Sequence, residues 1–251
     1  MSLIHYKFFS ECLGVQTGIY ICLPQPPSYR EPRSVTPPYP VLTLLHGQLD
    51  DYTAWSRYTS IERYADERKL AVVMPDIARS FCVDMSCGYR YFDYITRELP
   101  YVTEAVFPLS GKREERAVAG LSMGGYGAFL LALSRPDKFS AAASLSGCLD
   151  MADYDPEWFL PGEYDAIFPR ELAESRYDLF RLLRGLSGNT AGIPRLYHCC
   201  GAEDSLLAQN RKFSGFAASL GVPALYSEEP GDHGWAYWDK KIQDVINWLN
   251  I

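Results

Sequence analysis

Short apolar runs alternate with amphipathic stretches along most of the chain. Near-continuous apolar runs are typical of strands buried on both faces of a parallel sheet, and a period close to 3.6 residues indicates helices. We predict such strands at 41–45, 70–75, 116–119, 139–145, 195–200 and 224–228. We predict helices at 59–69, 91–107 with a break near Pro100, 125–134, 177–186, 206–220 and 238–251. This alternation predicts a mostly parallel sheet covered by helices on both faces.

Three segments depart from this alternation. Residues 4–23 alternate polar and apolar positions well enough for two antiparallel strands joined near 10–14. Residues 24–40 are rich in proline and predict an exposed, extended loop. Between 147 and 192 the alternation lapses and aromatic residues are scattered, which predicts an insertion over the strand ends, either a small lid or a segment packed onto the body. No second domain is visible, so we expect a single α/β domain over 1–251.

Composition narrows the class of protein. With 251 residues, 47% of them hydrophobic, the chain is long enough for one large core. Its net charge of −7 is dispersed without a basic patch, so we expect neither nucleic acid nor a membrane surface as a partner. The seven cysteines are odd in number and lack metal-ligand spacing, which favours free thiols in a reducing cytoplasm and no metal. The composition is compatible with a monomer. The proline-rich loop is equally compatible with a contact between subunits of a homo-oligomer.

The strongest chemical signal is a glycine-rich segment, AGLSMGGYG at 119–127, which contains the pattern G-x-S-x-G around Ser122. A predicted strand precedes it and a predicted helix follows it. A serine at such a sharp turn has a strained backbone, and small neighbours on both sides let the strand and helix approach closely. This context favours a nucleophilic serine over an ordinary capping serine in a tight turn.

A serine hydroxyl needs a general base, and the chain has four histidines. His233 lies between glycine and aspartate in a loop after a predicted strand, which makes it the favoured base for Ser122. His5 and His198 fall within predicted strands, where a core imidazole is the better interpretation. His46 begins the loop after the strand at 41–45, which we expect to supply an oxyanion donor. The alternative for His46 itself is a structural hydrogen-bonding role.

The base in turn needs an orienting carboxylate. Asp204 follows the predicted strand 195–200 and is favoured over its neighbour Glu203, which stays open as an alternative. Asp232 is too close to His233 in sequence for the usual orienting geometry. The resulting chain order of Ser122, Asp204 and His233 is that of the α/β-hydrolase fold. Because the carboxyl ends of parallel strands share one edge of a sheet, these three residues can meet there.

An oxyanion formed at Ser122 needs two N–H donors. The first expected donor is the backbone N–H of Met123, which follows the nucleophile. The second is expected from the loop after the strand at 41–45, where we favour Gln48 over Leu49. The alternative is that this loop is merely a turn.

These motifs together resemble the esterase D-type branch of the α/β-hydrolases. This branch includes small cytoplasmic tributyrin and acetyl esterases of bacteria and is related to S-formylglutathione hydrolases, feruloyl esterases and mycolyl transferases. The resemblance covers nearly the whole chain from Val41 onward. It is carried by LHG at 45–47, the block 84–95, ELP at 98–100, AGLSMGGYGA at 119–128, CGAED at 200–204 and DHGW at 232–235.

The resemblance implies the same triad of Ser122, Asp204 and His233, and it places the second oxyanion donor at Gln48. Relatives commonly have small or glycine residues after His-Gly, whereas this chain has Gln48-Leu49-Asp50.

The expected activity is hydrolysis of short-acyl carboxylic esters through an acyl-enzyme, without a metal or organic cofactor. Trp235 and Tyr89 are candidates for the wall of a small acyl pocket, with core or lid packing as the alternative for both. A thioesterase similar to S-formylglutathione hydrolase would use the same triad, and an acyltransferase would need a site that excludes water. A binding protein on an inactive hydrolase fold is the non-enzymatic alternative, which the complete triad disfavours.

Overall fold

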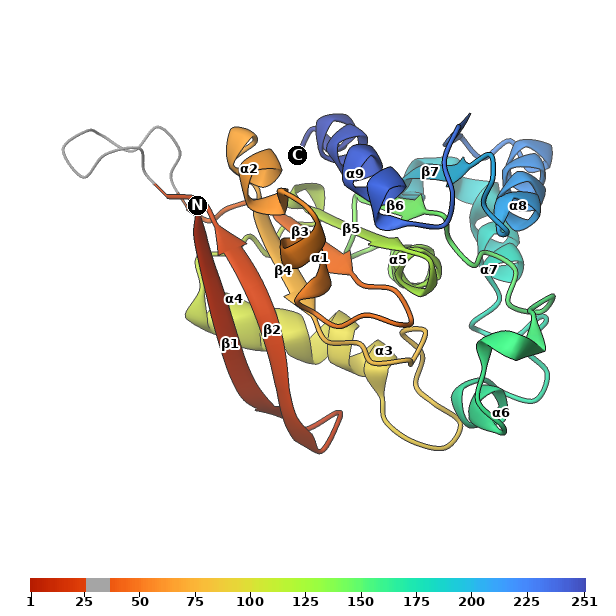
Figure 1. Ribbon diagram of the computed structural model, residues 1–251, viewed down its shortest axis with the longest axis horizontal. Helices are drawn as coiled ribbons and strands as arrows, with labels where there is room; N and C mark the ends of the chain where they lie inside the picture. The colour runs from red at the N-terminus through yellow and green to blue at the C-terminus, as the bar shows by residue number, and fades with distance from the viewer. Residues whose placement is uncertain (26–36) are drawn as a thin grey trace.

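An eight-stranded sheet forms the centre of the molecule in the computed structural model, which describes residues 1–25 and 37–251 (Figure 1). Its strand order is β1-β2-β4-β3-β5-β6-β7-β8. All neighbouring pairs from β4 to β8 are parallel, whereas β1 and β2 are antiparallel additions at one edge. The predicted α/β class is therefore confirmed. Of the predicted proline-rich loop at 24–40, residues 26–36 lie outside the described residues.

Every predicted strand is present, and the boundaries differ by only one or two residues. The strands are β1 (Ser2–Ser10), β2 (Val15–Leu23), β3 (Val41–Leu45), β4 (Ala71–Pro75), β5 (Arg116–Leu121), β6 (Ala141–Leu145), β7 (Arg195–Gly201) and β8 (Ala224–Glu229). Strands β3 to β6 are almost wholly buried, as expected of apolar strands covered on both faces.

The helices follow the predicted alternation with two additions. They are α1 (Ala54–Tyr58), α2 (Ile61–Glu67), α3 (Tyr91–Asp93), α4 (Leu99–Val106), α5 (Met123–Ser134), α6 (Glu163–Ile167), α7 (Leu179–Leu186), α8 (Leu207–Ser219) and α9 (Trp235–Leu249). A π-helical turn at Tyr94–Glu98 joins α3 to α4 and supplies the predicted break near Pro100. Proline has no N–H to donate, so a regular helical ladder cannot pass through this position.

The helix predicted over 59–69 is present as α2, and α1 is a separate helix that precedes it. Thr59 has extended backbone angles (φ −135°, ψ 170°) between them. Its hydroxyl donates to the carbonyl of Trp55 at 2.5 Å, and its oxygen accepts the N–H of Ile61 at 3.1 Å. A threonine side chain that bonds backbone on both sides competes with the helical ladder and ends it.

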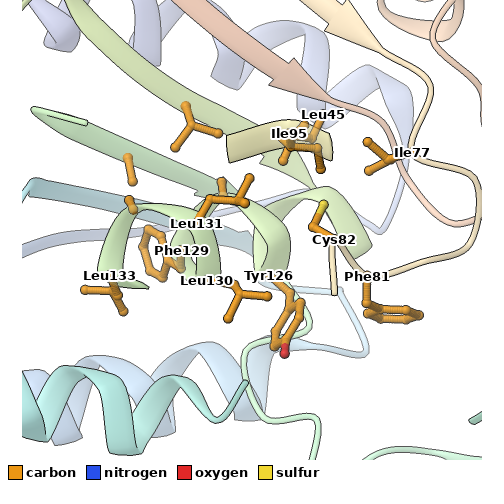
Figure 2. Packing of buried hydrophobic residues seen from close by; sticks show 14 of the residues in the cluster. Leu45, Ile77, Phe81, Cys82, Ile95, Tyr126, Phe129, Leu130, Leu131 and Leu133 are labelled. Carbon is orange, nitrogen blue, oxygen red and sulfur yellow. The ribbon is translucent and has the colours of Figure 1, made fainter. Parts of the chain in front are cut away.

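The two faces of the sheet have separate apolar cores. On one face α1, α2 and α9 cover the sheet with residues such as Trp55, Ile61 and Val245. On the other face lie α4, α5 and α8, and here α5 is buried over its whole apolar length (Figure 2). Helix α5 is apolar on every side because the sheet, α7 and the loop around Phe81 surround it. This packing fixes the start of α5, where the nucleophile candidate lies.

The insertion at 147–192 lies between β6 and β7 and contains α6 and α7. Of these two helices, α7 lies beside α8 (Figure 1). Its aromatic side chains pack onto the body of the molecule: Phe168 is buried against Phe81 and Tyr126. The hydroxyl of Tyr126 also donates to the carbonyl of Tyr177 at 2.6 Å. These contacts match the packed alternative, and a moving lid stays a prediction.

Candidate active site

Ser122 occupies the sharp turn between β5 and α5. Its backbone angles are φ 52° and ψ −117°, a strained conformation for a residue with a side chain. Three backbone hydrogen bonds hold it there: the N–H of Ser122 donates to the carbonyl of Leu145 at 2.9 Å, and its own carbonyl accepts from the N–H groups of Tyr126 at 3.1 Å and Cys148 at 3.3 Å. This is the turn that the G-x-S-x-G pattern predicts.

The glycines on either side of Ser122 permit a close approach of backbone segments. A Cβ atom on Gly124 would lie 2.6 Å from the carbonyl oxygen of His46, and one on Gly120 would overlap the carbonyl of Gly124. Neither position has room for a side chain. The prediction that small residues let the strand and helix pack together is confirmed.

Three residues far apart in sequence meet at the carboxyl edge of the sheet. The hydroxyl of Ser122 lies 3.0 Å from Nε2 of His233. The Nδ1 atom of His233 lies 3.0 Å from Oδ1 and 2.9 Å from Oδ2 of Asp204. Asp204 follows β7 and His233 follows β8, so the parallel sheet brings the two strand ends together with the end of β5.

The carboxylate of Asp204 is fully buried, whereas the side chain of His233 is 33% exposed. Burial by itself would raise the pKa of Asp204, but the hydrogen bond and charge of His233, with the N–H of Leu206 at 2.8 Å, lower it below its ordinary value. Asp204 is therefore ionised at neutral pH. Its oxygens accept from Nδ1–H, which leaves Nε2 of His233 free to accept a proton from Ser122.

The two other acid candidates point elsewhere. Glu203 accepts the backbone N–H of Gly231 at 2.6 Å. Asp232 turns back beside Gly234, with Oδ1 2.9 Å from where a Cβ atom would stand on that glycine. Within the part of the chain that the structure describes, Asp204 is the carboxylate that contacts the ring of His233.

Two of the remaining histidines are remote from this site. His5 in β1 bonds the hydroxyl of Tyr52 at 3.0 Å. His198 in β7 is buried and lies 3.4 Å from Oδ1 of Asn210, while its Nε2 has no partner among the described residues. Burial lowers the pKa of His198 to about 4, so the ring is neutral. The expected core imidazole is confirmed for His198 and wrong for His5, which is exposed because alternate residues of the edge strand β1 face solvent.

His46 is fully buried and organises the loop after β3. Its Nε2 accepts the backbone N–H of Ile77 at 3.0 Å, so the proton resides on Nδ1, which donates to the carbonyl of Gly47 at 2.7 Å. In a trans peptide the C=O and the following N–H point in opposite directions. The N–H of Gln48 therefore points away from His46.

The N–H groups of Gln48 and Met123 are both available. Among residues 1–25 and 37–251, neither donates a backbone hydrogen bond. Gly47, which precedes Gln48, approaches Ser122: the position of a Cβ on Gly47 lies 3.9 Å from Cβ of Ser122. The side-chain amide of Gln48 donates to the carbonyl of Trp158 at 2.9 Å, which ties this loop to the insertion.

A cavity of about 430 Å³ opens above Ser122. Its lining includes Trp235, as predicted, and three residues that sequence reasoning did not single out: Cys148, Trp158 and Leu206. Tyr89 lies elsewhere. It lines a neighbouring cavity on the other side of the 48–50 segment, because the 77–88 loop carries it toward the insertion rather than toward His233.

Cys148 lies next to Ser122, with Sγ 3.8 Å from its hydroxyl oxygen. It is buried, and burial raises the pKa of its thiol to about 12. The neutral thiol does not compete with Ser122 as a nucleophile. The sequence signal that could have identified Cys148 is its position three residues after the end of β6, because residues at the strand ends on this edge of the sheet form the site. All seven cysteines are free.

Comparisons with known proteins agree with this geometry. The model of the Esterase family, described as "Putative esterase", matches residues 10–249. An acetyl esterase of Caldicellulosiruptor saccharolyticus is 29% identical, covering 100% of this chain and 98% of that protein. A fluorophosphonate-binding serine hydrolase of Staphylococcus aureus, solved with substrate bound, is 34% identical with a TM-score of 0.89, covering 100% of this chain and 98% of that one.

A second structure, titled an S-formylglutathione hydrolase from Staphylococcus aureus, is 35% identical with a TM-score of 0.87 and covers 100% of this chain and 99% of that one. No helix in the described part of the chain is long and apolar enough to cross a membrane. The described residues also contain no cluster of three or more His, Cys, Asp or Glu side chains arranged to hold a metal ion.

Proposed function

Because the chain belongs to the Esterase family and is a serine carboxylic ester hydrolase with the α/β-hydrolase fold, we propose that Ser122, His233 and Asp204 perform its reaction. The observation that supports this most directly is the hydrogen-bonded chain from the Ser122 hydroxyl through both ring nitrogens of His233 to Asp204. The substrate is a small-molecule ester, and we propose that its acyl group is short.

In the acylation step, the hydroxyl oxygen of Ser122 attacks the ester carbonyl while Nε2 of His233 accepts its proton. The resulting oxyanion accepts hydrogen bonds from the N–H groups of Met123 and Gln48. The tetrahedral intermediate collapses, and His233 gives its proton to the departing alcohol oxygen. Asp204 keeps the proton on Nδ1 and stabilises the imidazolium, which agrees with its lowered pKa.

In the deacylation step, water replaces the alcohol. His233 accepts a proton from the water as its oxygen attacks the acyl carbon, and the same two N–H groups bind the new oxyanion. Collapse releases the carboxylic acid and returns the proton to the oxygen of Ser122. Every proton is carried by one histidine, so no metal or organic cofactor enters the proposed steps.

The preference for short acyl groups is supported by the size and closure of the cavity. The cavity directly above Ser122 has a volume of about 430 Å³, and the aromatic rings of Trp158, Trp235 and Trp238 bound it, which limits the length of an acyl group that enters it. Cys148 fills the space next to the nucleophile. The relative named acetyl esterase is consistent with this proposal.

A thioesterase acting on S-formylglutathione is the second candidate, supported by the name of one 35% identical structure. The same residues would attack a thioester carbonyl, and His233 would protonate the thiolate that leaves.

The test is a hydrolysis panel with the purified protein and its Ser122→Ala variant. We expect 4-nitrophenyl acetate and butyrate to be hydrolysed faster than the octanoate, and turnover to fall on the order of 10⁴-fold in the variant. Dominance of S-formylglutathione would move the assignment to the second candidate. A fluorophosphonate probe that still labels Ser122→Ala would contradict the choice of nucleophile.

We also propose a cytoplasmic location, supported by the seven free thiols, which persist in reducing compartments. Fractionation of the source cells with an antibody against the protein tests this: recovery in the secreted fraction would contradict it.

A further inference from the structure

Two cavities flank the segment Gln48-Leu49-Asp50. The first is the cavity above Ser122, and the second, of about 550 Å³, extends toward the insertion and is lined by Tyr89, Arg79 and Glu163. Gln48, Leu49 and Asp50 line both. A side chain in this segment can therefore contact an ester group bound in either cavity, whether it is the acyl half or the alcohol half.

The positive charge in the second cavity is already neutralised. Arg79 is the only lysine or arginine on the walls of either cavity within the described residues. Its Nε lies 2.5 Å from one oxygen of Glu163 and its terminal nitrogen 2.7 Å from the other, a two-point pair. The same terminal nitrogen donates to the carbonyl of Trp158 at 3.0 Å. Arg79 has little capacity left to bind an anionic substrate.

Asp50 is the carboxylate without a balancing cation. Within residues 1–25 and 37–251 it forms no ion pair, and the nearby Arg57 pairs instead with Asp51 at 3.6 Å. Its Oδ2 lies 3.1 Å from the Cβ position on Gly47, and that position is 3.9 Å from Cβ of Ser122. Asp50 is half-buried. A negative charge in this partly desolvated place acts on ligands more strongly than one in bulk water.

We propose that this site takes esters that are uncharged or positively charged on both sides of the ester bond, and that Asp50 is the residue that rejects anionic substrates. The inference rests on the proposed function and specifies its substrate class. An anionic group entering either cavity loses water, meets the charge of Asp50 and finds no unpaired cation in return. The two carboxylates of glutathione make S-formylglutathione a poor substrate by the same reasoning.

The test uses three phenyl acetates. The acetates of 3-hydroxybenzamide and 3-hydroxybenzoate have nearly equal shape and differ in charge, and the acetate of 3-hydroxyphenyltrimethylammonium carries a bulkier cation at the same position. Each kcat/KM is divided by the rate constant for alkaline hydrolysis of that ester, which removes differences in leaving-group reactivity. We expect the wild type to favour the neutral amide over the carboxylate by about tenfold or more, and to accept the cation at least as well as the amide. Equal use of the carboxylate would overturn the proposal.

Variants locate the discrimination. Asp50→Asn should narrow the amide-to-carboxylate ratio by about fivefold or more, and Glu163→Gln should narrow it by releasing Arg79. Asp165→Asn is the matched control, since it removes the same charge from an exposed side chain of the insertion that lines neither cavity and forms no ion pair among the described residues. If neither of the first two variants narrows the ratio, or if Asp165→Asn narrows it equally, the proposal is wrong.

The same experiment separates this inference from the proposed function. Turnover of the neutral amide ester that survives Ser122→Ala would refute the proposed function itself. Loss of that turnover together with an absence of charge discrimination in the wild type would refute the inference alone.

Discussion

The hydrogen bond from the Gln48 side chain to the insertion makes a sharp prediction about the oxyanion loop. The amide of Gln48 donates to the carbonyl of Trp158 at 2.9 Å, while its backbone N–H is the proposed oxyanion donor. Gln48→Leu removes the side-chain donor, keeps a similar volume and leaves the backbone N–H in place. The variant therefore asks whether the insertion holds the loop in its catalytic position.

The size of the effect follows from what is lost. A neutral hydrogen bond contributes about 0.5–1.5 kcal/mol net, so losing it lowers the equilibrium constant for correct placement of the loop by about two- to tenfold. We expect kcat to fall by up to that factor, with the melting temperature nearly unchanged. Removing an oxyanion donor itself costs about 10²–10³ in kcat. These two ranges distinguish a positioning role for the side chain from a direct one.

The assay is steady-state hydrolysis of 4-nitrophenyl acetate, with kcat and KM determined separately. Gln209→Leu is the matched control, because Gln209 donates a similar amide hydrogen bond to the insertion, at Asp153, 3.0 Å away and outside the cavity lining. We expect that variant to keep its kcat. A loss of 10² or more in Gln48→Leu would refute the positioning role, and so would an equal loss in both variants.

Three further predictions concern the residues around the nucleophile. Asp204→Asn should lower kcat/KM by about 10³–10⁴. Because folding lowers the pKa of Asp204, its stabilisation is present above the ordinary value of 3.8 and is lost as pH falls through the folded value, so melting temperatures between about pH 2 and 5 should show a shallower acid decline in the variant. Gly124→Ala should lower the free energy of unfolding by about 1–3 kcal/mol in urea titrations, since its Cβ would lie 2.6 Å from the carbonyl oxygen of His46, and an unchanged midpoint would contradict this. Iodoacetamide at pH 7.5 should label the exposed Cys87 well before Cys148, whose thiol pKa burial raises to about 12, and peptide mass spectrometry showing the reverse order would refute the assignment.

Local patterns predicted most of the fold because each buried strand and helix carries its own periodicity. The strands at 41–45 and 224–228 appear within one residue of their predicted ends. Chain order then predicted which strand ends carry Ser122, Asp204 and His233, since parallel strands share one carboxyl edge. These inferences needed sequence and topology alone.

The missed features depend on contacts between distant segments. The helix break at Thr59 results from one side chain that bonds backbone on both sides, which no hydrophobic pattern encodes. Trp158 reaches the cavity because the insertion folds back over the strand ends, whereas Cys148 follows the end of β6 directly. Tyr89 lines the neighbouring cavity instead of the one above Ser122, because the path of an irregular loop is set by what it packs against.

The tryptophans that line the cavity also provide an intrinsic fluorescence signal for events at this site. Of five tryptophans, Trp158, Trp235 and Trp238 line the cavity above Ser122, and Trp55 packs edge-on against Trp235 at 5.1 Å between ring centroids. Trp248, packed against Tyr197 in the core, is the remaining one. Ultraviolet emission from the unlabelled protein therefore originates mainly beside the nucleophile. Ligand entry, acylation and product departure should each change its intensity in a stopped-flow trace.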